Sequence, residues 1–285
     1  MALMTIRPMT PSEVQLALDW AAQEGWNPGL HDATVFYATD PTGFLIAELE
    51  GEPIGCICAV RYSSKFGFIG LYIVRPQWRG RGYGLQLWQT AWQQLVNQLE
   101  EKQPSIGLDG VVERESTYRQ AGFTAAYRHV RHVCEAMPCH SVPNNAISLT
   151  NVPLEQIVRY DAELFPAPRP QFLEPWIRVA AAAYGIVEHE RLVGYGVLRA
   201  CRQGFKVGPL FADTFDIAEC LFRALTHHAA SQPVFIDIPN IHPASSILIQ
   251  RFRLQPVFTC VRMYWKNMPN LDVNRIFGVT TLELG

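Results

Sequence analysis

The sequence has 285 residues, 48% of them hydrophobic, and a formal net charge of −2. This is the composition of a globular chain with enough apolar material for one large domain or two ordinary ones. The near-neutral charge excludes a global bias toward nucleic acid or an anionic membrane surface. No segment reaches about 18 uninterrupted apolar residues, so the sequence predicts no membrane span.

Seven cysteines are scattered along the chain without a CxxC spacing. Neither a zinc site nor a disulfide framework is indicated, and we interpret the cysteines as small buried hydrophobic residues in a reducing compartment. The first residues also lack the long apolar run of a signal peptide. Both observations predict a cytoplasmic protein.

The first expected element is a helix over 11–25, where PSEVQLALDWAAQEG begins with Pro-Ser-Glu and ends at a glycine. The segment 44–62 reads as a strand, a tight turn and a second strand. Another apolar strand is expected over 68–74, and it leads directly into a stretch rich in glycine and arginine.

After that stretch, apolar residues recur at spacings of three and four from Leu85 to Leu99, which predicts an amphipathic helix. A strand is then expected over 106–111. The segment 137–145, MPCHSVPNN, has two prolines and no periodicity, so it reads as a linker.

The second half of the sequence repeats the plan of the first. The segment 184–200 resembles 44–62, and Val193-Gly194 matches Ile54-Gly55. Weaker likenesses follow in the same order, 206–212 to 68–74 and 234–239 to 106–111. The shared order indicates a tandem duplication, and we predict an α+β fold with a mixed α/β sheet.

The stretch 75–88, RPQWRGRGYGLQLW, joins an apolar strand to a helix through three glycines. The first N–H groups of a helix have no internal partners and carry partial positive charge, so such a junction binds anions. Glycines let the backbone approach a phosphate closely, and Arg79 and Arg81 add charged donors. A P-loop is excluded because no Gly-Lys-Ser/Thr follows, and the dinucleotide fingerprint fails at Leu85.

Arg79-x-x-Gly82-x-Gly84 resembles the acetyl-CoA signature R/Q-x-x-G-x-G/A of the GNAT N-acetyltransferase superfamily. YRQAGF at 118–123 is similar to the Y-x-x-x-G-F motif of that family. Further motifs spread over the chain resemble a YitH-type subgroup with an N-terminal GNAT domain and a C-terminal GNAT-like one: EGWNPG, GLDGV, YGVLR, VGPLFAD and IDIPN. The resemblance implies two tandem domains, 1–140 and 146–285, each a twisted, mostly antiparallel sheet flanked by helices.

The resemblance also implies roles for residues of the first domain, which would bind acetyl-CoA. Tyr118 would protonate the leaving thiolate, since a phenol stays protonated at neutral pH. The pantetheine arm would lie beside Tyr72, Ile73 and Val74. The pyrophosphate would be held by the loop, through Arg79 and the backbone N–H groups of Gly80, Arg81, Gly82, Tyr83 and Gly84.

The strand that ends at Val74 carries no acid, so it supplies no general base. Asp109 and Glu113 are candidates by position, and a water chain or proton loss to solvent are alternatives. Candidate acceptor-binding residues lie between the first helices and at strand ends: Trp26, Asn27, Asp32, Asp109, Asp237 and Asn240. Histidines occur in pairs without a third ligand at useful spacing, so we expect no metal.

In the second domain, DTFDIAE at 213–219 stands where the glycine loop should repeat. Acids there repel pyrophosphate, so we expect this domain to bind no CoA and to help shape the acceptor pocket. The sequence thus predicts an acetyl-CoA-dependent N-acetyltransferase that acts on a small-molecule amine or a protein lysine, with no nucleic-acid or membrane partner. The alternative is a non-catalytic acyl-CoA-binding regulator or scaffold. The oligomeric state is not predicted.

Overall fold

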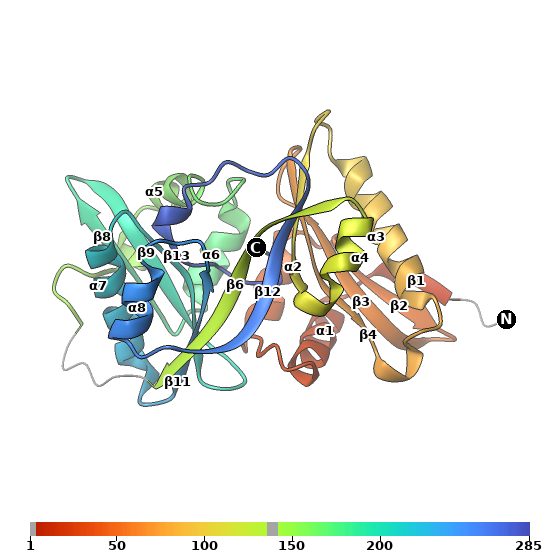
Figure 1. The fold of residues 1–285 in the computed structure, drawn as a ribbon, viewed down its shortest axis with the longest axis horizontal. Helices are drawn as coiled ribbons and strands as arrows, with labels where there is room; N and C mark the ends of the chain where they lie inside the picture. The colour runs from red at the N-terminus through yellow and green to blue at the C-terminus, as the bar shows by residue number, and fades with distance from the viewer. Residues whose placement is uncertain (1–3, 136–141) are drawn as a thin grey trace.

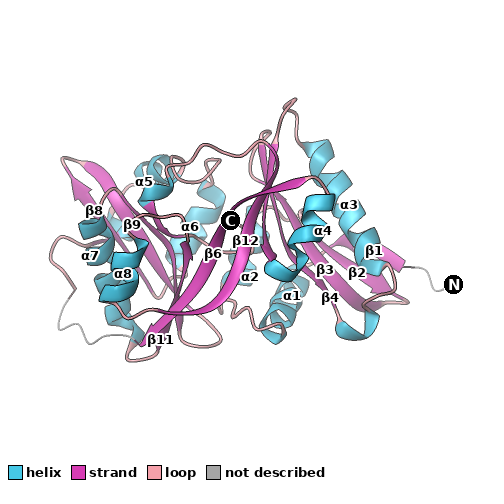
Figure 2. Ribbon diagram, in the orientation of Figure 1, coloured by secondary structure: helices cyan, strands magenta, loops and turns pink. Residues whose placement is uncertain are grey.

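The computed structural model describes residues 4–135 and 142–285, so the predicted linker 137–145 lies partly outside the described residues. Helices flank the strands throughout (Figures 1 and 2). The helices are α1 (Pro11–Gln23), α2 (Asp32–Thr39), α3 (Tyr83–Gln98), α4 (Glu115–Gln120), α5 (Leu154–Asp161), α6 (Pro170–Arg178), α7 (Phe215–Thr226) and α8 (Ser245–Arg251). Among the described residues, no helix is both long and apolar enough to cross a membrane.

The strands confirm the predicted repetition of hairpins in the two halves. In chain order they are β1 (Met4–Pro8), β2 (Phe44–Leu49), β3 (Glu52–Arg61), β4 (Phe66–Val74), β5 (Ser105–Val111), β6 (Phe123–Glu135), β7 (Ile147–Ser148), β8 (Ala182–Glu188), β9 (Arg191–Ala200), β10 (Phe205–Ala212), β11 (Pro233–Pro239), β12 (Gln255–Lys266) and β13 (Ile276–Gly278). The hairpins β2–β3 and β8–β9 fall where the sequence places them.

Local chemistry accounts for the first helix. Thr10 and Glu13 form a capping box at the start of α1, and Pro11 occupies its first turn. The apolar residues of α1 lie on one face and are buried, including Val14, Leu18 and Ala21. The helix is thereby fixed against the sheet.

The thirteen strands of the described residues form one continuous sheet, in the order β1-β2-β3-β4-β5-β12-β6-β11-β10-β9-β8-β7, with β13 beside β10. Neighbouring strands are antiparallel except for β4–β5 and β10–β11, which are parallel. This confirms the predicted mixed, mostly antiparallel sheet of an α+β fold.

The long strands β6 and β12 each pair with a strand of the opposite half. Strand β12 pairs with β5, where Cys260 faces Val111, and β6 pairs with β11, where Glu135 faces Pro233. The two exchanged strands also pair with each other. In Figure 1 they run side by side through the centre of the molecule, β6 in yellow-green and β12 in blue. The first half therefore receives a sheet strand from the second.

Three apolar clusters hold the layers together. One cluster joins the halves through α1, α2, α5 and α6, and the rings of Phe36 and Trp176 stack within it at 6.3 Å. A second cluster packs α3 against the first half of the sheet, and a third packs α7 and α8 against the second half. Buried ion pairs add polar links between the halves, Arg199 to Asp32 and Arg131 to Asp237.

Candidate active site

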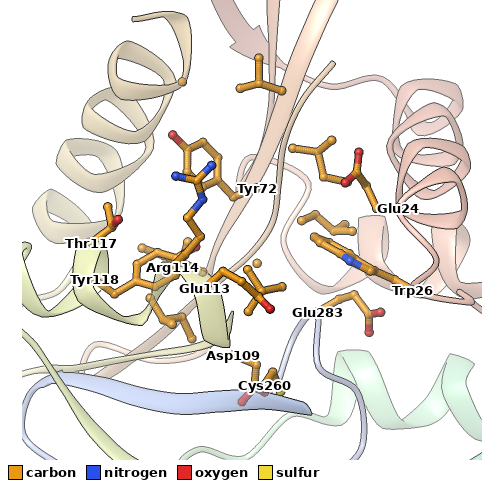
Figure 3. A pocket seen from close by; sticks show the side chains of 18 of the residues that line it. Glu24, Trp26, Tyr72, Asp109, Glu113, Arg114, Thr117, Tyr118, Cys260 and Glu283 are labelled. Carbon is orange, nitrogen blue, oxygen red and sulfur yellow. The ribbon is translucent and has the colours of Figure 1, made fainter. Parts of the chain in front are cut away.

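A cavity of about 560 Å³ opens between the glycine loop, β4 and α4 (Figure 3). One wall of the cavity is built by residues of the first half, such as Tyr72, Gly82 and Tyr118. Its other wall comes from the exchanged strands and the segment 279–285: Arg131, Phe258, Cys260, Leu282 and Glu283. One cavity thus joins both halves of the chain.

The glycine loop has the conformation that anion binding requires. Gly82 is the N-cap of α3 and has a φ of +84°, in the left-handed region that favours glycine. A Cβ placed there would meet nothing within 4 Å, so the loop faces open space. Gly80, Gly82 and Gly84 line the cavity, and the first N–H groups of a helix have no partner within it, so this end of the cavity is suited to an anion.

The two loop arginines are engaged with the protein itself. Nε of Arg79 donates to the Val74 carbonyl at 2.7 Å, and its guanidinium pairs with Glu24. Arg81 stacks over the ring of Trp78, 5.1 Å from its centroid. The contacts of Arg79 use donors that the sequence assigns to the ligand, whereas the Arg81 guanidinium forms no hydrogen bond with the described residues; the binding roles of both arginines stay predictions. The cation that lines the cavity beside Tyr118 is Arg114, which the sequence motifs do not single out.

Tyr118 lies in α4 and projects to the cavity wall. Its ring packs against Trp88 and Phe123 with centroids 5.7 and 6.3 Å apart. Burial and the neighbouring Tyr72 raise the pKa of Tyr118 to about 12, although the charge of Arg114 acts in the opposite direction. The phenol is therefore protonated at neutral pH and can donate a proton.

Asp109 also lines the cavity, but its side chain is fully buried and committed to other groups. Arg262 grips both carboxylate oxygens at 2.9 and 2.7 Å, and Nδ1 of His129 lies 2.9 Å from one of them. Burial opposes ionisation, but the charges of Arg262 and His129 outweigh it and lower the pKa of Asp109 to about 2. A carboxylate held in this way is a weak proton acceptor at neutral pH.

The same shift makes stability depend on pH. An aspartate whose folded pKa is lowered from about 3.9 stabilises the fold above that value and loses its contribution as the pH falls through about 2. Urea unfolding measured between about pH 6 and about pH 2 should therefore show stability that decreases with acid. The Asp109→Asn variant should lose part of this pH dependence, and an unchanged slope would contradict the assignment.

Asp109, His129 and Cys260 bring three potential ligand atoms within 4.8 Å of one another. The sequence pairs no third ligand with His129, because Cys260 reaches it only through the β6–β12 register. Metal ligands must be deprotonated, yet burial raises the pKa of the Cys260 thiol well above its usual value. Arg262 already neutralises Asp109. These features oppose a cation at this cluster.

The candidate acceptor residues separate into two groups. Trp26 lines the cavity, as does Asp109. Four others are not among its lining residues and have partners inside the protein: Asn27 with Gln203, Asp32 with Arg199, Asp237 with Arg131, and Asn240 with the backbone of Arg128. Their binding role stays a prediction that this geometry does not favour. Glu113 lines the cavity at its exposed edge.

Sequence reasoning misses Glu283. Glu283 is only 4% exposed and lines the cavity. Its Oε2 atom has no hydrogen-bond partner among the described residues. Nothing local in LELG signals a site, because the position is defined by contacts with β3 and β4, far earlier in the chain.

Known proteins resemble this chain in both of its halves. A model described as "Acetyltransferase (GNAT) family" matches residues 12–108, and one described as "Acetyltransferase (GNAT) domain" matches 157–278. The holothin acyltransferase of Pseudoalteromonas sp. (strain SANK 73390) is 27% identical over 284 residues, covering 99% of this chain and 94% of that protein.

Two solved structures share the fold. A putative acetyltransferase from Pyrococcus horikoshii superposes with a TM-score of 0.82 at 23% identity, over 99% of this chain and 96% of that one. A tandem GNAT protein from the clavulanic acid biosynthesis pathway gives 0.62 at 14% identity, over 94% and 100%. Enzymes of this family use acyl-CoA donors. The chain belongs to the GNAT superfamily of acyltransferases and carries two GNAT domains in tandem.

Proposed function

We propose that the protein transfers an acetyl group from acetyl-CoA to the amino group of a small molecule. The observation that carries this proposal is the single cavity that connects the glycine loop to the protonated Tyr118. The second wall of the same cavity, with Trp26 and Phe258, leaves a partly aromatic site for an acceptor. The relative named holothin acyltransferase supports a small-molecule acceptor over a protein lysine.

The residues present fit the donor. The N–H groups of residues 80–84 would hold its pyrophosphate, and Tyr72, Ile73 and Val74 would lie along its pantetheine arm. Arg79 would orient this loop through Val74 and Glu24. When bound, acetyl-CoA supplies an acetyl thioester to the amine. Holding both reactants in one cavity makes the transfer effectively unimolecular.

Tyr118 has the central chemical role. As the carbon–nitrogen bond forms and the carbon–sulfur bond breaks, its phenol gives a proton to the departing sulfur. The surplus proton of the nitrogen passes to solvent, from which Tyr118 regains its own. The products are an amide and the free thiol, with one proton released when the amine enters as an ammonium ion.

We further propose two units, 1–140 and 146–285, of which only the first binds CoA. At the start of α7, Asp213 accepts hydrogen bonds from Tyr160 and Arg275, each at 2.8 Å. Thr214 caps the helix by accepting from the Ile217 N–H at 3.4 Å. These contacts cap the start of α7 with the protein's own groups, and the charge of the aspartate would repel a phosphate there. The six cysteines of the described residues are free, which supports a reducing, cytoplasmic location.

Replacing Tyr118 with phenylalanine should lower kcat by about a hundredfold or more, because the general acid is lost. Acetyl-CoA affinity should stay within about threefold, since the hydroxyl contributes little to donor binding. Release of free thiol would be followed with a panel of small primary amines that includes holothin.

Tyr184→Phe is the control, because Tyr184 bonds His228 in the second half, away from the cavity. Acetyl-CoA binding without thiol release from any amine would favour the alternative of a non-catalytic regulator. An unchanged kcat in Tyr118→Phe would contradict the role of the phenol.

A further inference from the structure

Glu283 is a buried carboxyl group with an unused oxygen. The residue is 4% exposed, it lines the cavity, and Oε2 has no hydrogen-bond partner among the described residues. Leaving a buried acceptor unsatisfied is costly, so such groups usually have a partner. Because Glu283 lines the cavity, a ligand bound there would lie beside this carboxyl group.

The backbone holds Glu283 firmly beside β4. Its carbonyl accepts from the Cys58 thiol at 3.5 Å, and the carbonyl of Leu284 accepts from the Tyr62 hydroxyl at 2.9 Å. Gly70 in β4 permits this close approach, because a Cβ there would lie 2.0 Å from the Glu283 carbonyl oxygen. The segment 279–285 thus places the acid Glu283 beside β4, a strand that contains no acidic residue.

No ion pair or side-chain hydrogen bond is formed by the Glu283 carboxylate with the described residues, although cations lie near it. It interacts electrostatically with three buried cations, Arg131, Arg199 and Lys206. Arg131 pairs with Asp237, and Arg199 pairs with Asp32 through Nη1, while Nε and Nη2 of Arg199 have no hydrogen-bond partner among the described residues. Nζ of Lys206 donates to the Asn27 carbonyl at 3.0 Å.

The other acids of the cavity are less suitable for binding a cation. Asp109 is gripped by Arg262, and Glu24 pairs with Arg79. Glu113 is exposed at the rim, where solvent weakens charge interactions. Figure 3 places Glu283 and the ring of Trp26 on the side of the cavity opposite Tyr118 and Arg114. An aromatic face beside a carboxylate is suited to an ammonium group.

We propose that Glu283 binds the ammonium group of the acceptor, which makes the acceptor an amine that is protonated in solution. The nitrogen loses one proton to solvent before it attacks the thioester, so the neutral amine is the nucleophile. This inference rests on the proposed function, because it requires the acyl donor in the same cavity. Glu283 is then a specificity-determining residue that the second half of the chain delivers to the site of the first.

Two CoA thioethers of matched length test the proposal without knowledge of the natural acceptor. S-(3-aminopropyl)-CoA carries an ammonium group where S-butyl-CoA carries a methyl group, and both affinities can be measured by calorimetry. The wild type should prefer the aminopropyl compound by about tenfold or more, as expected for a charge-assisted hydrogen bond. Glu283→Gln should lose this preference and keep its affinity for S-butyl-CoA, which also shows that the site remains folded.

Glu188→Gln is the control, because Glu188 is an exposed acid at the end of β8 that does not line the cavity, and this variant should leave the preference intact. If the wild type binds both compounds equally, or Glu283→Gln retains the preference, the inference is wrong while the CoA site stands. If neither compound binds the wild type, the proposed CoA site is wrong and the inference falls with it.

Discussion

Replacing Asp109 with alanine is expected to lower the free energy of unfolding by about 3–5 kcal/mol, the range for breaking a buried ion pair from one side. The side chain of Asp109 is fully buried, and that of Arg262 is 5% exposed. Removing the carboxylate leaves the guanidinium charged and without its two short hydrogen bonds. Urea unfolding at neutral pH measures the change as a lower midpoint.

The double variant Asp109→Ala with Arg262→Met provides the control. It removes both charges, and the methionine can pack against Phe68, over whose ring the Arg262 guanidinium lies at 5.1 Å. Replacing a buried pair by apolar groups is often nearly neutral, so the double variant should regain much of the lost stability. A single variant that loses less than about 1 kcal/mol would place the pair in the range of a surface salt bridge instead.

Replacing Gly82 with glutamate is expected to weaken acetyl-CoA binding by about a hundredfold or more, because like charges placed together cost several kcal/mol. The surrounding space admits the side chain, so the fold should survive with a moderate loss of about 1–2 kcal/mol from the left-handed backbone. A ligand at 100 times its Kd adds about 2.7 kcal/mol of stability, and this increment should vanish in the variant.

Gly51→Glu separates backbone strain from loss of the anion site. Gly51 has the same φ of +84°, also meets nothing within 4 Å, and lies in the turn between β2 and β3 away from the cavity. Thermal unfolding with and without acetyl-CoA should show the ligand shift in this variant but not in Gly82→Glu. A full shift in Gly82→Glu would mean that the donor binds elsewhere.

Features that depend on neighbouring residues are readable from the sequence. The α3 helix, the β2–β3 hairpin and the glycine junction each follow from spacing and turn chemistry within about twenty residues. The exchange of β6 and β12 is not readable in this way. Both strands are long and could pair with either β5 or β11, so the choice depends on contacts across the whole chain.

The residues of the candidate site also separate into those that local motifs indicate and those that depend on distant contacts. Tyr118 and Gly82 belong to local motifs, so the sequence can propose them as site residues, and both line the cavity. Glu283 meets Cys58 across 225 residues of chain, and no periodicity or motif records that contact. Arg79 is recognisable as part of the signature, but its pairing with Glu24, the C-cap of α1, depends on how α1 packs against β4.

The exchanged strands also set the order in which the protein can be completed during synthesis. A nascent chain folds from its N-terminus as it leaves the ribosome. Strand β5 has its final neighbour only when Gln255–Lys266 has emerged, so the finished donor half must wait with an open sheet edge, a surface prone to pairing with other chains. Any early contact between β5 and β6 must open again to admit β12. Completion of the sheet beside the cavity is therefore a late event, coupled to the emergence of nearly the entire polypeptide.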